Sequence, residues 1–507
     1  MLLGVVLHAC MAYMGPYWLV HDRGESGLLT AVWVFIHSWR MELFFVLAGY
    51  FAAMVLRREG AVGMVRRRGR RLLLPFALAL VTITPLTLWL ADVAQAKNES
   101  RGGNASQLAE PIHEAVRKGD LAALQRLDPE DPELGNAQYL AAALGQTRAL
   151  QALLQRTNGR PAETMLASLH GENALHASVR FGQPAATRII LDAARGRAWE
   201  RELLQTRNER DQTAAQLLTA DERETRTIAR KLGLTRSSSE IQAGRSEALA
   251  LLEPGQPLNP RWHRWLGALH QPILHHLWFM WVLLLLTLLF GAWAWVNERW
   301  TLPAVPRWML AEWTRLLWLL PVTTALFWWG RPEQGFGING EMSFLEKPAT
   351  IVFFGLFFAF GAALRLRGTE PARLPWLAWV QLPALTFFVL PLAFASAWSS
   401  QPFFYFLSCA LQACVAWGLT FTFLDLCTAY LAKPIAAVRT LADASLWIYL
   451  AHLPMVIALQ MLMATWRLWP VVKCGLICGV TVGTLLLVNH CCIRRTWVGL
   501  LLNGKKA

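Results

Sequence analysis

The chain contains a series of apolar stretches, each of which is long enough to cross a lipid bilayer. Ten such stretches begin near residues 2, 32, 72, 274, 309, 351, 376, 403, 446 and 472. A transmembrane helix needs ~20 predominantly apolar residues, and in lipid a helix pairs its own backbone polar groups. The sequence therefore predicts an all-α fold, a polytopic membrane bundle of about ten transmembrane helices.

Composition and charge agree with a membrane location. Hydrophobic residues make up 55% of the chain, charged residues 16%, and the formal net charge is +14. Much of this excess lies in short segments after the second, fourth, sixth and eighth stretches and at the C-terminus. Short basic loops mark the cytoplasmic side, so we expect both termini to be cytoplasmic and expect no nucleic-acid partner. These residues are Arg57, Arg58, Arg66–Arg68, Arg70, Arg71, Arg299, Arg307, Arg365, Arg367, Arg373, Lys433, Arg439, Arg494, Arg495, Lys505 and Lys506.

A polar segment of different character interrupts the apolar stretches. Residues 97–236 contain helical units rich in Ala and Leu, with turns near Gly119, Gly145, Gly182 and Asp221. Such units bury their apolar faces only by stacking. The insert resembles ankyrin repeats, whose signature includes T-P-L-H-x-A, most closely at residues 173–177 and 111–115. A generic array of helical hairpins is the alternative.

These patterns divide the chain into five parts. We predict a membrane domain whose first part is 1–96, the ankyrin-like insert at 97–236, and a linker at 237–262. The second membrane part is 263–500, and a cytoplasmic tail covers 501–507. Counting the spans places the insert outside the cytoplasm, in the periplasm of a two-membrane bacterium.

The second apolar stretch, residues 32–56, carries ionisable residues that are costly in a bilayer. His37 and Arg40 are three residues apart, so they can share one helical face, and Glu42 follows. Such residues in membranes face a protein interior or a wet cavity. We expect Arg40 to hold an anion and His37 to handle a proton; an Arg40–Glu42 pair that only joins helices is the alternative. Gly49 lets a helix or ligand approach closely.

Histidines in three other stretches are also candidates. His8 is our candidate general base, since an imidazole with an ordinary pKa near 6.5 can accept a proton near neutral pH. His276 and His452 are expected to support the site. For each lone histidine, packing against a neighbouring helix is the alternative. His113 and His176 occupy ankyrin-like positions where a histidine caps or buttresses the turn, so we assign them no catalytic role.

A basic element follows the second stretch. Arg68 and Arg71 stand in a predicted loop at the cytoplasmic mouth, and guanidinium groups grip phosphates in a bidentate manner. We therefore expect them to bind a phosphate-bearing donor such as an acyl-CoA. A role in topology or in contact with anionic lipid headgroups is the alternative. No motif predicts a resident cofactor or a metal site, and the eight cysteines lack zinc-site spacing.

Four blocks occur in the same order in the acyltransferase-3 family, which the chain resembles over residues 1–96 and about 270–500. They are FIHSWRMELFFVLAGYF, the R-x-x-R-L-L-L-P element, HLWFMWVL and ASLWIYLAHLP. The resemblance implies transfer of an acyl group from a cytoplasmic donor to an extracytoplasmic glycan hydroxyl. It maps the family's first-span histidine to His8 and its arginine pair to Arg68 and Arg71.

The family also has an arginine eleven positions before the first-span histidine, and that position would precede Met1. We expect the true start to lie upstream; otherwise the chain lacks this residue. The main hypothesis is an inner-membrane O-acyltransferase that adds a succinyl or acetyl group to a periplasmic or surface glucan, with the insert binding a protein or the glycan. The alternatives are a membrane-anchored ankyrin scaffold with an inactive acyltransferase domain and, last, a transporter.

Overall fold

The computed structural model describes most of the chain. The residues outside the description are 1, 16–17, 101–110, 127–132, 163–171, 209–211, 220–224, 226–227, 230–231, 235, 253–272, 301–304, 313, 331–335, 339, 341–342, 369–374, 400, 431–434, 495, 497–498 and 500–507. The side chains of 95–96, 98–100, 111–112, 218–219, 375 and 436–437 are also outside it. The predicted turn at Asp221 and the predicted tail fall on undescribed residues.

The chain divides into two compact units. Unit 1 contains Met1–Asn98 and Pro272–Ala507, and unit 2 contains Glu99–Gln271. Every regular element of the described residues is helical, which confirms the all-α prediction for that part of the chain.

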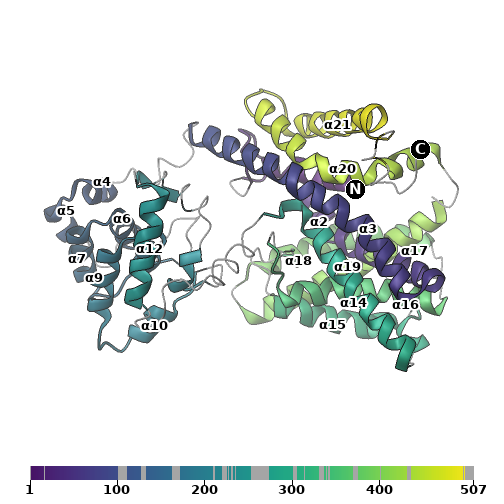
Figure 1. Cartoon of the computed structure of the whole chain (residues 1–507), viewed down its shortest axis with the longest axis horizontal. Helices are drawn as coiled ribbons and strands as arrows, with labels where there is room; N and C mark the ends of the chain where they lie inside the picture. The colour runs from purple at the N-terminus through teal and green to yellow at the C-terminus, as the bar shows by residue number, and fades with distance from the viewer. Residues whose placement is uncertain are drawn as a thin grey trace. The chain divides into compact units, whose positions relative to one another are not determined.

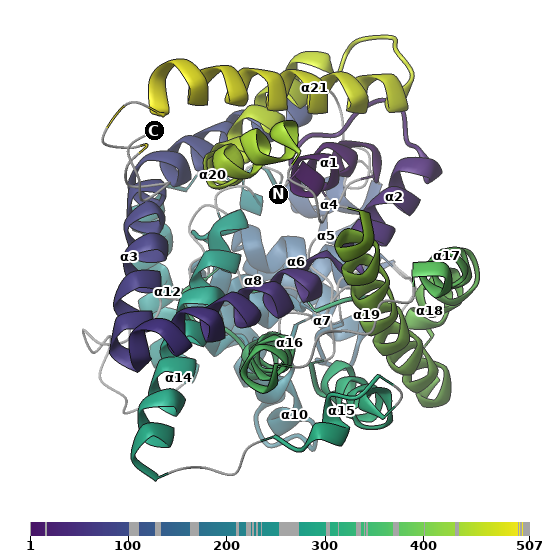
Figure 2. The ribbon, with the colours of Figure 1, turned by 90° about the vertical axis from the view of Figure 1, so that its right-hand side faces the viewer.

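Unit 1 is built from long apolar helices (Figure 1). Its elements are α1 (Leu2–Cys10), η1 (Met11–Tyr13), α2 (Gly27–His37), α3 (Arg40–Ser100), η3 (His275–Leu277), α14 (Trp278–Trp300), η4 (Arg307–Met309), α15 (Arg315–Gly330), α16 (Pro348–Arg367), α17 (Pro375–Ala384), η5 (Leu385–Val389), α18 (Leu390–Ala397), α19 (Pro402–Tyr430), α20 (Ala436–Met463), α21 (Pro470–Val488) and η6 (Asn489–Ile493). The helix α20 packs against both α1 and α21, and Figure 2 shows these three helices side by side.

Seven helical segments in the described residues are long and apolar enough to cross a membrane, so the predicted count of ten is not confirmed. One of the seven, Gly27–Ala94, contains two of the predicted spans in a nearly continuous helical run. Two further predicted spans are short: α1 has 9 residues and α15 has 16.

Helix α3 bends sharply at Gly60. The backbone there has φ +69°, outside the helical region, and divides α3 into a first arm (40–59) and a second arm (61–100). Glycine is favoured at such a φ because it has no Cβ. Residues 66–71 lie within the helical second arm, so the prediction of a loop around Arg68 and Arg71 is wrong.

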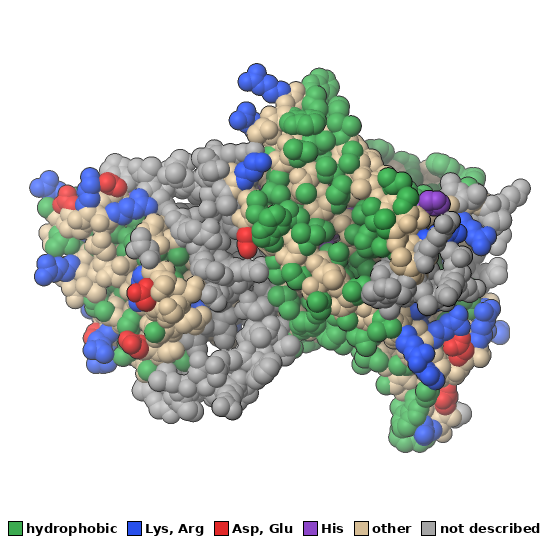
Figure 3. All heavy atoms as spheres, turned by 45° about the horizontal axis from the view of Figure 1, so that its top comes forward, with side chains coloured by type: hydrophobic (Ala, Val, Ile, Leu, Met, Phe, Trp, Pro, Cys, Tyr) green, Lys and Arg blue, Asp and Glu red, His purple; other side chains and the backbone are tan. Residues whose placement is uncertain are grey.

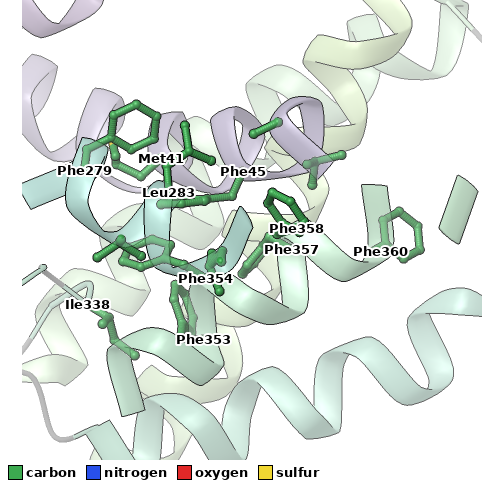
Figure 4. Close-up of a cluster of buried hydrophobic side chains, with 14 of the residues drawn as sticks. Met41, Phe45, Phe279, Leu283, Ile338, Phe353, Phe354, Phe357, Phe358 and Phe360 are labelled. Carbon is green, nitrogen blue, oxygen red and sulfur yellow. The ribbon is translucent and has the colours of Figure 1, made fainter. Parts of the chain in front are cut away.

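The largest core of unit 1 is rich in phenylalanine. Phe45 of α3 stacks on Phe354 of α16, with ring centroids 4.6 Å apart, and Phe279 of α14 lies against Phe45 (Figure 4). A Cβ at Gly49 would lie only 1.9 Å from the carbonyl oxygen of Phe358. The prediction that Gly49 permits a close approach is therefore confirmed, and the partner is helix α16.

Large apolar side chains also cover much of the outside of unit 1. Phe387, Phe388 and Leu317 are 72%, 75% and 73% exposed. Figure 3 shows hydrophobic side chains over the face of unit 1, with Lys and Arg at its edges. Such extensive exposed apolar surface suits a lipid environment.

Unit 2 consists of short helices. They are α4 (Pro111–Lys118), α5 (Leu121–Gln125), α6 (Leu134–Leu144), α7 (Thr147–Arg156), α8 (Ala174–Arg180), α9 (Pro184–Ala194), α10 (Glu200–Gln205), η2 (Ala215–Thr219) and α12 (Ser238–Leu252). Pairs α4/α5, α6/α7 and α8/α9 are hairpins that turn at Gly119, Gly145 and Gly182, each with positive φ. The three predicted turns are thereby confirmed, whereas the ankyrin assignment stays a prediction.

Helix α12 differs from the sequence prediction. Residues 238–252, which we predicted to be part of a linker, form a helix whose Ile241, Gly244, Arg245 and Ala248 are buried. A Cβ at Gly244 would lie 2.0 Å from the carbonyl oxygen of Gly182, so two glycines bring their backbones together. This part of the predicted linker is therefore a packed helix of unit 2.

Candidate active site

Four polar residues from separate parts of the chain meet inside unit 1. The His452 ring of α20 lies 5.3 Å from the His8 ring of α1 and 5.2 Å from the His276 ring of η3, measured between centroids. Arg40, the first residue of α3, completes the group. A Cβ built on Gly4 would lie 3.2 Å from Arg40 Nη1 and 3.9 Å from His452 Nε2.

Backbone carbonyls fix the tautomers of two of these histidines. His452 Nδ1 lies 2.7 Å from the Tyr449 carbonyl oxygen, and His276 Nε2 lies 3.0 Å from that of Leu450. A carbonyl only accepts hydrogen bonds, so we assign the ring proton to the nitrogen that faces it. His452 Nε2 and His276 Nδ1 are the remaining nitrogens, and both are buried without a hydrogen-bond partner among the described residues. Each therefore offers a lone pair to the interior of the site.

The His8 ring has two ring neighbours. It stacks on Trp18 with centroids 5.7 Å apart, and the His452 ring lies at 5.3 Å. Its Nδ1 is buried and has no hydrogen-bond partner among the described residues. The side chain that the sequence predicts as the base thus has an unused buried nitrogen, as His452 and His276 do.

The predicted continuous span at 32–56 is interrupted where the polar residues lie. Helix α2 ends at His37 and α3 begins at Arg40, with Ser38 and Trp39 forming the turn between them. Ser38 Oγ donates to the Phe35 carbonyl oxygen at 2.9 Å. The break places Arg40 at a helix start instead of in the middle of a span.

His37 faces a different part of unit 1. Its ring stacks on Trp33 with centroids 4.7 Å apart. A Cβ at Gly337, which has φ +75°, would lie 2.7 Å from His37 Nε2. The ring contacts of His37 are thus with Trp33 and the loop before α16, whereas those of His8 are with Trp18 and His452.

Arg40 and Glu42 do not supply all of each other's hydrogen-bond partners. Glu42 is 4% exposed, and its Oε2 and the Nε of Arg40 are both buried with no hydrogen-bond partner in the described part of the chain. A buried cation without complete compensation favours an anion or a developing negative charge nearby. The two side chains thus leave buried polar atoms beside the site that no described residue satisfies, and the anion-holding role of Arg40 stays a prediction.

Arg68 joins the two arms of α3. Its Nη1 donates to the carbonyl oxygen of Ala48 at 3.1 Å, across the bend at Gly60. Ala48 is eight residues after Arg40, a rise of ~12 Å along a helix. Arg71, one turn further along the second arm, is exposed. The contacts connect Arg68 to the arm that begins with Arg40, and they bring neither arginine to the histidines.

Several basic ends of unit 1 lie together. Arg57 of α3 donates to the carbonyl oxygen of Leu366 in α16. Arg367 Nε donates to Val305 at 2.7 Å, and the Ala61 amide donates to Glu298 Oε1 of α14 at 3.1 Å. Three of the segments that the sequence predicts on one side of the membrane therefore meet at one end of the bundle.

Sequence reasoning missed several residues around the site. Tyr449 lies one turn before His452, and its hydroxyl donates to the His276 carbonyl oxygen. The block ASLWIYLAHLP contains both residues, so their helical spacing is a usable signal. Gly4, one turn before His8 in α1, had no comparable signal. Within the described residues, no three His, Cys, Asp or Glu side chains come together in a way that would hold a metal ion.

The fold and this cluster define a class, a polytopic helical membrane protein with a buried histidine–arginine site. The chain belongs to the acyltransferase-3 family: the family model, described as an acyltransferase domain, matches residues 1–99 and 233–489. Glucans biosynthesis protein C from Escherichia coli strains SMS-3-5 / SECEC and K12 is 33% identical over 103 residues, which is 20% of this chain and 27% of those proteins. The matched part thus spans about a quarter of these relatives. No solved structure matches the chain.

Proposed function

We propose that the chain is an O-acyltransferase that moves an acyl group from a cytoplasmic acyl-CoA to a hydroxyl of a periplasmic or surface glucan. The observation that carries this proposal is the meeting of His8, Arg40, His276 and His452 inside a membrane unit. The name of the relatives, glucans biosynthesis protein C, supports a glucan acceptor. An inactive scaffold gives no reason to bury these polar groups around a common space.

The proposed reaction needs a base and an anion stabiliser. His8 accepts the proton of the glucan hydroxyl while that oxygen attacks the thioester carbonyl. Arg40 stabilises the negative oxygen of the tetrahedral intermediate. The C–S bond then breaks, the coenzyme A thiolate leaves, and the proton on His8 passes to it. The products are a glucan ester, with a succinyl or acetyl group, and the free thiol.

The other predicted residues have supporting roles in this scheme. His276 and His452 present lone pairs beside His8 and assist proton transfer, and Glu42 moderates the charge of Arg40. We place His37 on the path of the acyl group, because it lies three residues before Arg40 at the same break between α2 and α3. Arg68 and Arg71 bind the donor phosphates, and the contact of Arg68 with the Arg40 arm supports this arrangement.

We propose a bacterial inner-membrane location with both termini in the cytoplasm and the insert in the periplasm. The shared basic end formed by α3, α14 and α16 supports this orientation, because basic segments favour the cytoplasmic side. We further propose that the insert is an ankyrin-like array that binds a protein partner or the glucan. Its three consecutive hairpins with glycine turns support that likeness.

The test is acyl transfer by the full-length chain in membranes, with acetyl-CoA and succinyl-CoA as donors and a glucan oligosaccharide as acceptor. We expect His8→Ala to reduce thiol release and ester formation to background. His490→Ala is the matched control, because His490 is an exposed histidine near the end of unit 1. If His8→Ala transfers as well as the unchanged chain, the catalytic assignment is wrong. If the unchanged chain transfers neither group, the scaffold alternative stands.

A further inference from the structure

The last turn of α1 is held by a side chain from α20. His8 lies two residues before the end of α1, where the α-helix gives way to the 3₁₀ turn η1. Carbonyls at a helix end lack their regular partners, and in a membrane such groups need donors from the protein. The Nε2 of Gln460 donates to the carbonyl oxygens of His8 and Ala9, at 2.9 Å and 3.3 Å.

The side-chain oxygen of Gln460 also has a hydrogen-bond partner. Trp18 Nε1 donates to Gln460 Oε1 at 2.9 Å. An indole nitrogen only donates and a carbonyl only accepts, so this is the one amide orientation that satisfies all three bonds. Gln460 is 2% exposed, and the exchange of its bonds for water is therefore blocked. The amide has no freedom to turn while these partners remain.

Trp18 closes the arrangement on the side chain of His8. Its ring stacks on the imidazole, with centroids 5.7 Å apart and planes 27° apart. A single chain of contacts thus runs from the His8 backbone through Gln460 to Trp18 and back to the His8 ring. Figure 2 shows the two helices involved, α1 and α20, next to each other.

We propose that Trp18 and Gln460 are positioning residues that fix the backbone and the ring of His8 for proton transfer. The inference rests on the proposed function, because it presumes that His8 is the base. Neither residue touches the reacting atoms in this scheme. Their effect is geometric: displacement of a catalytic group by about 1 Å can cost on the order of a hundredfold in rate.

The experiment uses two substitutions that each remove the shared hydrogen bond. Gln460→Met keeps the length of the side chain without its polar atoms, and Trp18→Phe keeps an aromatic face without the N–H. In the full-length chain, with acetyl-CoA, succinyl-CoA and a glucan oligosaccharide as probes, we expect each to lower kcat by about tenfold to a hundredfold, with the donor KM within about twofold. The fold reduction in kcat of the double variant is expected to be much smaller than the product of the two single reductions, because each single change already breaks the same hydrogen bond.

Two matched controls separate positioning from general damage. Gln381→Met removes a hydrogen-bonded glutamine of α17, and Trp379→Phe removes a hydrogen-bonded indole that lies beside Tyr430. Both are expected to keep kcat. If Gln460→Met and Trp18→Phe also keep kcat while His8→Ala is inactive, the positioning role is overturned and the proposed function survives.

A second measurement does not depend on acyl transfer. Diethyl pyrocarbonate modifies accessible imidazole nitrogens, and the modified peptide containing His8 can be quantified by mass spectrometry. We expect faster labelling of His8 in Gln460→Met than in Gln381→Met, because the clamp on α1 is released. Equal labelling rates would contradict the inference, whatever activity is found. Faster labelling in a chain whose His8→Ala variant stays fully active would support the clamp while removing the proposed function.

Discussion

Gly4 of α1 lies directly against the guanidinium group of Arg40: a Cβ on Gly4 would be 3.2 Å from Arg40 Nη1. It would also be 3.9 Å from His452 Nε2. The lack of a side chain at this position therefore leaves the space that Arg40 and His452 share. Gly4 is one helical turn before His8. The same face of α1 therefore carries the His8 side chain and borders the space next to Arg40 and His452.

We expect substitution at Gly4 to reduce acyl transfer in proportion to the size of the new side chain. Gly4→Ala should have a small effect, because the end of an arginine side chain can shift. Gly4→Val should push Arg40 away and lower kcat by about tenfold to a hundredfold. The measurement is thiol release from acetyl-CoA by the full-length chain, and Gly475→Val, which meets nothing within 4 Å, is the control. Equal activity of the two valine variants would mean that Arg40 need not occupy its observed place.

The sequence predicted the helical class, the polar character of the second apolar stretch and a set of candidates that includes the four residues that meet. It also placed His37 with them, whereas the His37 ring stacks on Trp33. His8, Arg40, His276 and His452 stand out because ionisable groups are costly in apolar spans, and that cost can be read without a structure. The three glycine turns of the insert were equally readable, since positive φ favours glycine.

What escaped prediction depends on contacts between distant segments. The break at Ser38 and Trp39 falls among the polar residues of a stretch whose total length and hydropathy suit a single span, so it was not predicted. Residues 66–71 are helical although their charge suggested a loop, since arginine is itself a good helix former. The Arg68 side chain donates to a carbonyl in the other arm. Gln460 gave no signal either, since its importance arises from bonds to residues more than four hundred positions away.

A pair of glycines sets the distance between α3 and α16. A Cβ at Gly49 would lie 1.9 Å from the Phe358 carbonyl oxygen, and one at Gly361 would lie 1.9 Å from that of Val46. Backbone atoms cannot yield as a flexible side chain does. We expect Gly49→Ala and Gly361→Ala each to lower the unfolding free energy by about 1–3 kcal/mol or more. Denaturant unfolding in detergent micelles measures this, and Gly475→Ala should change it little; equal stability of all three variants would refute the close approach.

A buried ion pair joins the segment after α1 to α21. Lys473 Nζ lies 2.6 Å from Asp22 Oδ2, and the two side chains are 2% and 3% exposed. Removing one partner of a buried pair leaves the other charge uncompensated, at a cost of about 3–5 kcal/mol. We therefore expect Asp22→Asn and Lys473→Met each to lower the unfolding temperature strongly. The double variant should be more stable than the sum of the single losses implies; strictly additive losses would show that the two groups do not interact.

The insert contains a second buried pair, which predicts a dependence on pH. Glu172 accepts hydrogen bonds from Arg180 and from Tyr139, the latter at 2.8 Å. Burial alone would raise the pKa of Glu172, but the Arg180 charge and these hydrogen bonds outweigh it and hold the pKa below its usual value. The contribution of Glu172 to the stability of the folded insert is fully present above the pKa of an unfolded glutamate, about 4.3. It is lost as the pH falls towards the lower pKa that Glu172 has in the folded state.

We accordingly expect the insert of the full-length chain to lose hydrogen-exchange protection below about pH 4.3. Exchange, corrected for its intrinsic pH dependence, should rise in peptides from α6, α8 and α9. Glu172→Gln should weaken protection already at neutral pH, because it leaves the buried Arg180 without its carboxylate, and should flatten the acid dependence. Glu202→Gln removes an exposed pair with Arg160, whose side chain is 54% exposed, and should change protection much less because exposed ion pairs contribute little.

Since His176 also has a pKa lowered by burial, some loss of protection begins below about pH 6.5, where an unfolded histidine gains its proton. A Glu172→Gln variant that kept the full acid dependence below pH ~4.3 would assign that dependence to other carboxylates.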